Sequence, residues 1–245
     1  MFTNWPFNHY SSKGKTISYY PSEIFNDEFD ANNVFELNLD FPTIVAAYEE
    51  VKDVLSGEFF EGYQVSESGI GLQSFCPGWN GDMRWISPGD EAGFAFFDKY
   101  FDKLRVAEKT NELFGVCNEL IMYSGFFVVR SFTKNTYYHI DYSGSVGLNA
   151  FTLMTPVMQT RVGNLLYHDI KGEEQVYNYT RGKAVCFGGD FYHSTEPFES
   201  PEPYVFLCFT YGVTDTEIWD SIAETAAEQC KIFRHPTQGI VYRDS

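Results

Sequence analysis

A series of short strand-like segments in the second half of the chain constrains the fold more than any other feature. From Glu119 onward, apolar residues alternate with polar ones or form brief apolar runs, which is typical of strands. Turn-forming pairs such as Lys134-Asn135 and Arg181-Gly182 separate the segments. The candidate strands are Leu120–Phe132, Tyr137–Tyr142, Leu148–Thr155, Gly163–His168, Gln175–Tyr179, Ala184–Phe187, Tyr192–Ser194 and Tyr204–Tyr211. Eight short strands in succession predict an antiparallel jelly roll.

Helical periodicity appears on both sides of this strand region. Apolar residues at helical spacing predict one helix from Phe41 to about Leu55 and a second from Asp90 to about Leu113. The stretch between them, 56–89, is rich in Gly and Pro and predicts loops, and 216–233 predicts a C-terminal helix. The expected fold is therefore α+β, mainly β: a double-stranded β-helix, or jelly roll, flanked by N-terminal helices and a C-terminal helix.

No repeat or linker divides the sequence, so we expect one domain over residues 1–245. Within it, we expect a buttress of helices and loops at 1–118, the jelly-roll core at 119–211, and a C-terminal helix and tail at 212–245.

Charge and composition exclude several classes of partner. The chain has 17 Lys and Arg against 34 Asp and Glu, which gives a formal net charge of −17. Such a chain repels phosphate backbones and anionic membranes, so we expect binding to neither nucleic acid nor membranes. The five cysteines lack paired short spacing, and the N-terminus lacks the basic and apolar regions of a signal peptide. A reducing, cytoplasmic location is the expectation.

Three residues point to a metal site. His139 and Asp141 are two apart in a predicted strand, so both side chains project from the same face. His193 follows another predicted strand and a Gly-Gly-Asp turn. If His193 meets the other two, two imidazoles and one carboxylate would occupy one side of a metal and leave the other side open, which suits non-haem Fe(II). The alternative is that both histidines are hydrogen-bonded core residues and Asp141 caps a turn.

The stretch from Phe126 to Tyr211 resembles the catalytic core of the Fe(II)/2-oxoglutarate-dependent oxygenases, a superfamily with a cupin-like double-stranded β-helix. Phe127-Val128-Val129-Arg130 is similar to the first core strand, His139-Ile140-Asp141 matches the His-x-Asp motif, and 182–193 matches the Gly-x-x-x-x-Phe … His segment. The resemblance covers about a third of the chain. It implies Fe(II) held by His139, Asp141 and His193, with 2-oxoglutarate as cosubstrate and dioxygen as oxidant.

The sequence departs from this family where the cosubstrate should be anchored. The family usually places an Arg or Lys at the start of the last core strand, which here falls at 202–204, and none of these residues is cationic. Arg161 is the first candidate for the missing cation, and Arg130 and Lys183 come next. By resemblance to the JmjC-like branch, Asn149 is a further candidate for contact with the cosubstrate. Tyr137 shares strand parity with His139 and could donate a hydrogen bond to cosubstrate or substrate.

We expect an Fe(II)-dependent dioxygenase, with 2-oxoglutarate as its cosubstrate, that hydroxylates, desaturates or cyclises a small molecule. An amino-acid-like or other small metabolite is the leading expectation for the substrate. Two alternatives stay open: an Fe(II) oxygenase that does not use 2-oxoglutarate, and a metal-binding jelly-roll module without turnover.

Overall fold

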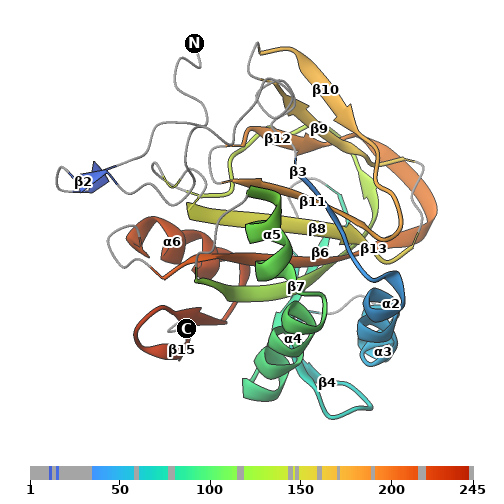
Figure 1. Ribbon diagram of the computed structural model, residues 1–245. Helices are drawn as coiled ribbons and strands as arrows, with labels where there is room; N and C mark the ends of the chain where they lie inside the picture. The colour runs from blue at the N-terminus through green and yellow to red at the C-terminus, as the bar shows by residue number, and fades with distance from the viewer. Residues whose placement is uncertain are drawn as a thin grey trace.

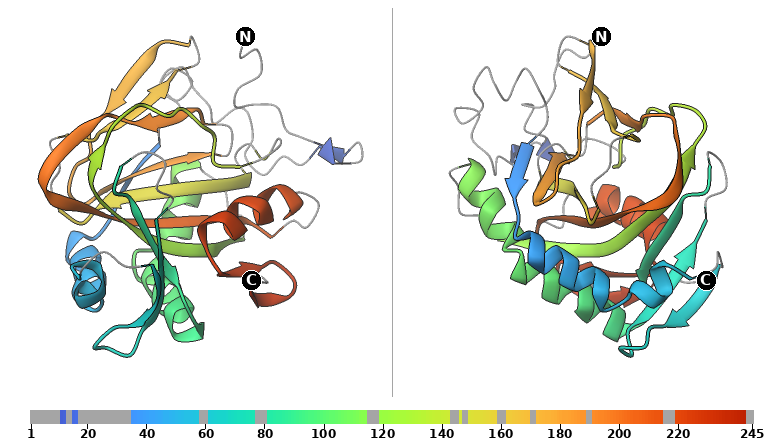
Figure 2. Two further views of the ribbon diagram at one scale, coloured as in Figure 1. Left: turned by 180° about the vertical axis from the view of Figure 1, so that it is seen from behind. Right: turned by 90° about the vertical axis from the view of Figure 1, so that its right-hand side faces the viewer.

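The computed structural model describes residues 35–57, 61–76, 81–114, 119–142, 146, 149–158, 162–169, 172–188, 191–214 and 219–242, together with the backbone of 11–12 and 15–16. Among these residues, two antiparallel sheets lie one above the other, and helices cover the far face of the larger one (Figures 1 and 2). This is the expected jelly roll with a helical buttress.

The large sheet has eight strands in the order β3-β11-β8-β13-β7-β6-β5-β4. Their bounds are β3 Phe35–Asn38, β4 Gly62–Val65, β5 Gly71–Phe75, β6 Arg84–Pro88, β7 Leu120–Thr133, β8 Ala150–Pro156, β11 Lys183–Gly188 and β13 Phe198–Val213. β7 and β13 pair along most of their length and form the centre of the sheet. The long central ladder is the platform on which the rest of the site is built.

The small sheet places β9 (Leu165–His168) between β10 (Glu174–Tyr177) and β12 (His193–Thr195). His139 forms an isolated antiparallel bridge with His193 and so continues this sheet beyond β12. Two short hairpins form small sheets of their own: β1 (Ser11–Ser12) with β2 (Lys15–Thr16), and β14 (Ile232–His235) with β15 (Gly239–Tyr242). The second hairpin packs against the large sheet through Ile232 and Phe233.

Two of the helices, α2 and α4, begin at aspartate caps that the sequence supplies. α2 (Phe41–Glu49) starts after Asp40, whose carboxylate accepts the Thr43 N–H at 3.1 Å, and α3 (Lys52–Leu55) follows directly. α4 (Glu91–Lys103) starts after Asp90, which accepts the Gly93 N–H at 2.8 Å. A side-chain acceptor at this position satisfies one of the free N–H groups of the first turn. The remaining helices are α5 (Val106–Phe114) and α6 (Trp219–Gln229).

Side chains on the large sheet alternate between two apolar layers. On β7, Phe127 and Val129 pack with the helices, and the Phe127 ring lies 5.6 Å from that of Phe97 on α4. Phe126 and Val128 point the other way, into the layer between the two sheets. The space between the sheets is therefore lined by alternate residues of each strand, as the strand period of two requires.

The structure corrects four details of the expected secondary structure. The stretch expected to be loops contains β4, β5 and β6, which extend the large sheet. The second helix is broken between α4 and α5, where Arg105 has a φ of 55°. The C-terminal helix ends at Gln229, and the β14–β15 hairpin follows. The expected strand at 137–142 is reduced to the bridge at His139, because the chain turns away after one pair.

Candidate metal centre and adjoining pocket

The two histidines lie side by side because their backbones pair. The His139 N–H donates to the His193 carbonyl at 2.9 Å, and the His193 N–H donates to the His139 carbonyl at 3.0 Å. Residues that exchange both hydrogen bonds in an antiparallel pair stand directly opposite each other, with both side chains on the same face. The two imidazole centroids are accordingly 4.5 Å apart. Strand pairing thus brings together two residues that are far apart in the sequence.

Both imidazoles are held in the orientation that a metal ligand needs. Nδ1 of His139 lies 3.0 Å from the Tyr137 carbonyl oxygen, and Nδ1 of His193 lies 3.0 Å from the Phe191 carbonyl oxygen. A carbonyl can only accept, so each Nδ1 carries the proton and each Nε2 presents a lone pair. A backbone carbonyl on the second ring nitrogen is a common way to fix the tautomer of a metal-binding histidine.

Asp141 completes the group with one carboxylate oxygen. Its Oδ2 accepts a hydrogen bond of 2.6 Å from the Thr152 hydroxyl on β8, which turns Oδ1 toward the imidazoles. Oδ1 lies 3.5 Å from Nε2 of His139 and 3.6 Å from Nε2 of His193. The Thr225 hydroxyl on α6 also donates to the Asp141 backbone carbonyl and holds the segment from the other side.

The arrangement fits one metal ion. The three ligand atoms all lie within 4.8 Å of one another. Metal–nitrogen and metal–oxygen bonds of about 2.0–2.2 Å place ligand atoms on one side of an ion about 3 Å apart, so the Asp–His separations of 3.5 and 3.6 Å need to shorten by only about half an ångström. Three ligands on one side leave further coordination positions free, which is the pattern of a 2-His-1-carboxylate site for Fe(II).

The charge state of His193 also favours metal binding. Burial lowers the pKa of the His193 imidazole, and the nearby Asp141 carboxylate opposes this without cancelling it. A lowered pKa keeps the ring neutral near neutral pH, so its Nε2 lone pair is available to a cation. His139 is more exposed, at 41% of its side-chain surface, and forms the rim of the site.

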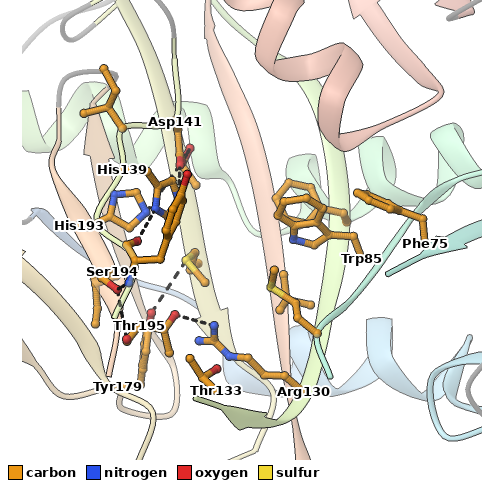
Figure 3. Close-up of a pocket in the computed structure, with 18 residues that line it drawn as sticks. Phe75, Trp85, Arg130, Thr133, His139, Asp141, Tyr179, His193, Ser194 and Thr195 are labelled. Carbon is orange, nitrogen blue, oxygen red and sulfur yellow. Dashed lines mark hydrogen bonds and ion pairs between the residues drawn. The ribbon is translucent and has the colours of Figure 1, made fainter. Parts of the chain in front are cut away.

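The three residues face a pocket of about 710 Å³ between the two sheets. This volume lies within the usual range for small-molecule sites. Its lining consists of Phe75, Met83, Trp85, Phe126, Val128, Arg130, Thr133, Tyr137, His139, Ile140, Asp141, Thr152, Met154, Leu165, Tyr179, His193, Ser194 and Thr195. Figure 3 shows the His139, Asp141 and His193 group at one side of the pocket, with Arg130 at its base and Trp85 and Phe75 opposite.

Arg130 is the one basic residue that lines the pocket among the residues described here. It is 5% exposed, and its Nη1 donates to the Thr195 hydroxyl at 2.6 Å. Its Nε and Nη2 are buried without a hydrogen-bond acceptor in the described part of the chain. Burial lowers the pKa of this guanidinium, but an arginine stays protonated in proteins. A buried charge with two unpaired donors is costly unless an anion completes it.

Thr195 connects this arginine to the metal ligands. His193 and Thr195 are two residues apart on β12, so both point into the pocket, about 6.6–6.8 Å apart along the strand. We call Arg130, Thr133, Tyr179 and Thr195 the basic end of the pocket; Figure 3 shows them together. A ligand with an anionic group at the basic end can therefore reach the metal side with its other end.

The other residues named from the sequence lie as follows. Tyr137 lines the pocket and is 57% exposed, and its backbone N–H donates to the Ser194 hydroxyl. Asn149 is buried outside the pocket lining, and its amide donates to the Val146 carbonyl at 3.1 Å. Lys183 forms an ion pair with Glu36. Arg161 lies outside the described residues.

Two parts of the site carry no signal that sequence reasoning used. Thr152 orients Asp141, but a threonine in a predicted strand looks the same whichever residue it faces. Phe75 and Trp85 line the pocket from a stretch that was expected to be loops. Residues 71–75 and 84–88 do not alternate regularly between apolar and polar side chains, so periodicity gives no strand signal there.

Comparison with known proteins shows the fold. No family model matches the sequence, and no curated protein sequence is significantly similar to it. Among solved structures, the chain is similar to the non-haem alpha-ketoglutarate-dependent epimerase SnoN from nogalamycin biosynthesis, with a TM-score of 0.58, 13% identity, and 76% of this chain and 80% of SnoN covered. It is also similar to HygX from Streptomyces hygroscopicus, solved with nickel and 2-oxoglutarate bound. The TM-score is 0.54 at 12% identity, and 78% of this chain and 88% of HygX are covered.

A third similar structure is the non-haem alpha-ketoglutarate-dependent carbocyclase SnoK from nogalamycin biosynthesis. The TM-score is 0.56 at 12% identity, and 79% of this chain and 86% of SnoK are covered. By its likeness to these three structures, the chain has the double-stranded β-helix fold that Fe(II)/2-oxoglutarate-dependent oxygenases share.

Within the described residues, no helix is long and apolar enough to cross a membrane.

Proposed function

We propose that this protein is an Fe(II)- and 2-oxoglutarate-dependent dioxygenase that oxidises a small molecule. The observation that carries the proposal is the convergence of His139, Asp141 and His193, each with one ligand atom aimed at a shared point. The fold shared with alpha-ketoglutarate-dependent enzymes supports it.

The donor set favours iron in the ferrous state. Two neutral imidazole nitrogens and one carboxylate oxygen suit Fe(II), and the three free positions can accept a chelating cosubstrate and dioxygen. In the chain itself, Tyr137 and Phe191 fix the tautomers through their carbonyls, and Thr152 fixes the carboxylate. These groups hold the ligand atoms in place before the metal arrives, and such outer contacts contribute strongly to metal affinity.

The basic end of the pocket supports 2-oxoglutarate as the cosubstrate. Its distal carboxylate would accept hydrogen bonds from the free Nε and Nη2 of Arg130, while its keto-acid end reaches the metal side. Planar guanidinium groups bind carboxylates through two parallel hydrogen bonds. Arg130 thus serves as the cationic anchor that the family's sequence pattern places at the start of the last core strand, here β13.

Bound together, Fe(II) and 2-oxoglutarate supply the oxidation of a substrate C–H bond by dioxygen, with release of succinate and carbon dioxide. The protein contributes position and a dry environment. Val128, Phe126 and Leu165 line the pocket with apolar surface and limit the water that it holds. The pocket opens past the more exposed Tyr137 and His139, which is where a substrate would enter.

The test is an anaerobic titration with Fe(II) followed by 2-oxoglutarate. We expect a weak visible charge-transfer band when both are present, and slow succinate formation once air is admitted. His193→Ala should lose the band, because one ligand is removed. His168→Ala should keep it, because His168 packs against Tyr138 and Tyr192 outside the pocket lining.

Each other outcome points to a different function. Tight Fe(II) binding without the band or succinate would favour an iron oxygenase that does not use 2-oxoglutarate. Failure of the wild-type protein to bind Fe(II) would overturn the proposal and favour a binding module with this fold.

A further inference from the structure

The wall of the pocket opposite the metal ligands is built from three aromatic side chains. Phe75 on β5 and Trp85 on β6 are direct partners across the antiparallel ladder, and Trp85 in turn pairs with Val128 on β7. Paired residues share a face of the sheet, so Phe75 and Trp85 point into the pocket together with Phe126. We call Phe75, Trp85 and Phe126 the aromatic wall; Figure 3 shows Trp85 and Phe75 across the pocket from the histidines.

The aromatic wall is incompletely covered by the protein. Phe75 and Trp85 are only partly buried, unlike the aromatic residues on the helix side of the same sheet. Their ring centroids are 5.1 Å apart at an interplanar angle of 50°, and Trp85 meets Phe126 at 6.5 Å and 75°. The rings are tilted and not stacked in parallel, so the wall keeps ring surface that a flat ligand can cover.

Charge limits what the pocket can hold beside iron and 2-oxoglutarate. Within the described lining, Arg130 is the single Lys or Arg and Asp141 is the single Asp or Glu. Under the proposed function, on which this step rests, Arg130 pairs with the cosubstrate and Asp141 with the metal. An anionic group on a second ligand would then face the aromatic wall without a partner, because ring faces attract cations and not anions, and desolvating an unpaired charge is strongly unfavourable.

We infer that the substrate is a molecule without an anionic group, with a flat, aromatic or conjugated ring system that packs on the aromatic wall and presents a C–H bond to the metal side. Such a molecule covers the exposed ring surface of Phe75 and Trp85 and needs no ion pair with the protein. This narrows the substrate class and disfavours free amino acids, whose carboxylate would lack a partner.

The experiment measures binding directly, without turnover. The full chain, loaded anaerobically with Fe(II) and 2-oxoglutarate, is dialysed against 2-naphthol, against its saturated counterpart decahydro-2-naphthol, and against L-leucine as a competitor. We expect 2-naphthol to bind about five- to tenfold more tightly than the saturated alcohol, because only the flat ring stacks. L-Leucine should not displace it.

Variants then locate the binding surface. Trp85→Leu and Phe75→Leu keep apolar bulk and remove one ring each, so both should weaken 2-naphthol binding and reduce the preference over the saturated alcohol. Phe132→Leu is the matched control, since Phe132 lies on β7 but not in the pocket lining. Melting temperatures show that each variant is folded before its binding is compared.

The inference is overturned if 2-naphthol fails to bind, if both wall variants bind it as the wild type does, or if L-leucine competes. These failures are separate from failure of the proposed function, which appears as a missing charge-transfer band before any probe is added. A band together with no naphthol binding therefore removes the substrate class and leaves the oxygenase in place.

Discussion

The Thr152 hydroxyl decides which oxygen of Asp141 faces the two imidazoles. We expect Thr152→Val to lower Fe(II) affinity about 10- to 100-fold, because the carboxylate loses the 2.6 Å hydrogen bond that orients it. Isothermal titration with Co(II) or anaerobic Fe(II) measures the change. Thr152→Ser keeps the hydroxyl and should restore most of the affinity.

Thr155 provides the control on the same strand. Its hydroxyl points to the other face of β8 and donates to the Lys183 carbonyl. Thr155→Val should therefore cost some stability and leave metal affinity unchanged. Equal losses of metal affinity in the two valine variants would show that Thr152 has no special part in positioning Asp141.

Arg130 is the second residue whose role can be tested alone. Arg130→Met removes the charge and keeps an unbranched side chain, so we expect 2-oxoglutarate affinity to fall about 10- to 150-fold, as the loss of about 1.5–3 kcal/mol from charged hydrogen bonds implies. Fe(II) binding should persist. Added 2-oxoglutarate should raise the melting temperature of the Fe(II)-loaded wild type and have little effect on the variant.

Lys183→Met is the matched control, because Lys183 also lies on a core strand but pairs with Glu36 away from the pocket. An unchanged 2-oxoglutarate affinity in Arg130→Met would move the anchor elsewhere in the chain, with Arg161 as the next candidate from the sequence.

At the residue scale, the sequence predicts the metal ligands better than their support. A strand period of two places His139 and Asp141 on one face without knowledge of the fold. Thr152, by contrast, becomes a partner of Asp141 only because β8 lies beside the end of the 139–142 segment. The position of a residue on a neighbouring strand depends on long-range pairing, which periodicity does not contain.

Pairing between β7 and β13 explains how an arginine on the first core strand can replace one on the last. Arg130 stands directly opposite Tyr204 in this ladder, and Tyr204 lies at the place where the family pattern expects the cation. Directly opposed side chains share a face and lie within about 4.5–5.5 Å at Cβ. We expect Arg130→Met/Tyr204→Arg to recover part of the 2-oxoglutarate affinity that Arg130→Met loses.

Binding of 2-oxoglutarate to the single and double variants, followed by the charge-transfer band, measures this recovery. Tyr204→Phe in the Arg130→Met background is the control, because it alters Tyr204 without adding a charge. No gain from the arginine beyond that of phenylalanine would contradict the exchange across the ladder.

The contact between α4 and β7 depends on Gly125. A Cβ at this position would lie 2.6–2.7 Å from Cδ1, Cβ and Cγ of Phe97 on α4, so the helix would have to move. We expect Gly125→Ala to lower the free energy of unfolding by about 1–3 kcal/mol, as overpacking typically does. Urea titration measures it, and Gly125→Ala should cost less in a Phe97→Ala background, which lacks Cγ and Cδ1; strictly additive losses would contradict the contact.

At the element scale, the bounds expected from the sequence agree best with the structure for strands whose own residues show a clear strand pattern. β7, β8, β9 and β11 form close to their expected bounds because each is a mainly apolar run between turn residues. β13 begins at Phe198, earlier than the expected start at Tyr204. Pro201 and Pro203 interrupt its pairing with β7 between Glu199 and Tyr204, but Phe198 and Glu199 pair with β7 before the interruption. β4, β5 and β6 contain or adjoin Gly and Pro, and their strand character comes from pairing outward from β7.

At the scale of the whole molecule, the same two-layer arrangement makes both the core and the pocket. One face of the large sheet is closed by helices and buries apolar residues fully. The other face is only partly closed by the three-stranded sheet, and the pocket occupies the remaining space. The sequence predicts both sheets in outline, but which face stays open depends on where β4–β6 add to the edge.

The net charge of −17 sets the last expectation, because it acts on every anionic ligand that approaches. 2-Oxoglutarate carries two negative charges, so the long-range field of the protein repels it, whereas the proposed anchor Arg130 is buried and would attract it only at short range inside the pocket. Salt screens exposed charges over about 30 Å at 0.01 M and about 10 Å at 0.1 M, and screens buried pairs much less. We therefore expect the association rate of 2-oxoglutarate to rise several-fold with KCl over this range while its dissociation rate changes little. Stopped-flow absorbance of the charge-transfer band measures both rates, and the association of uncharged 2-naphthol should not respond to salt. An association rate that falls with salt would mean that local positive charge at the pocket entrance outweighs the acidic surface.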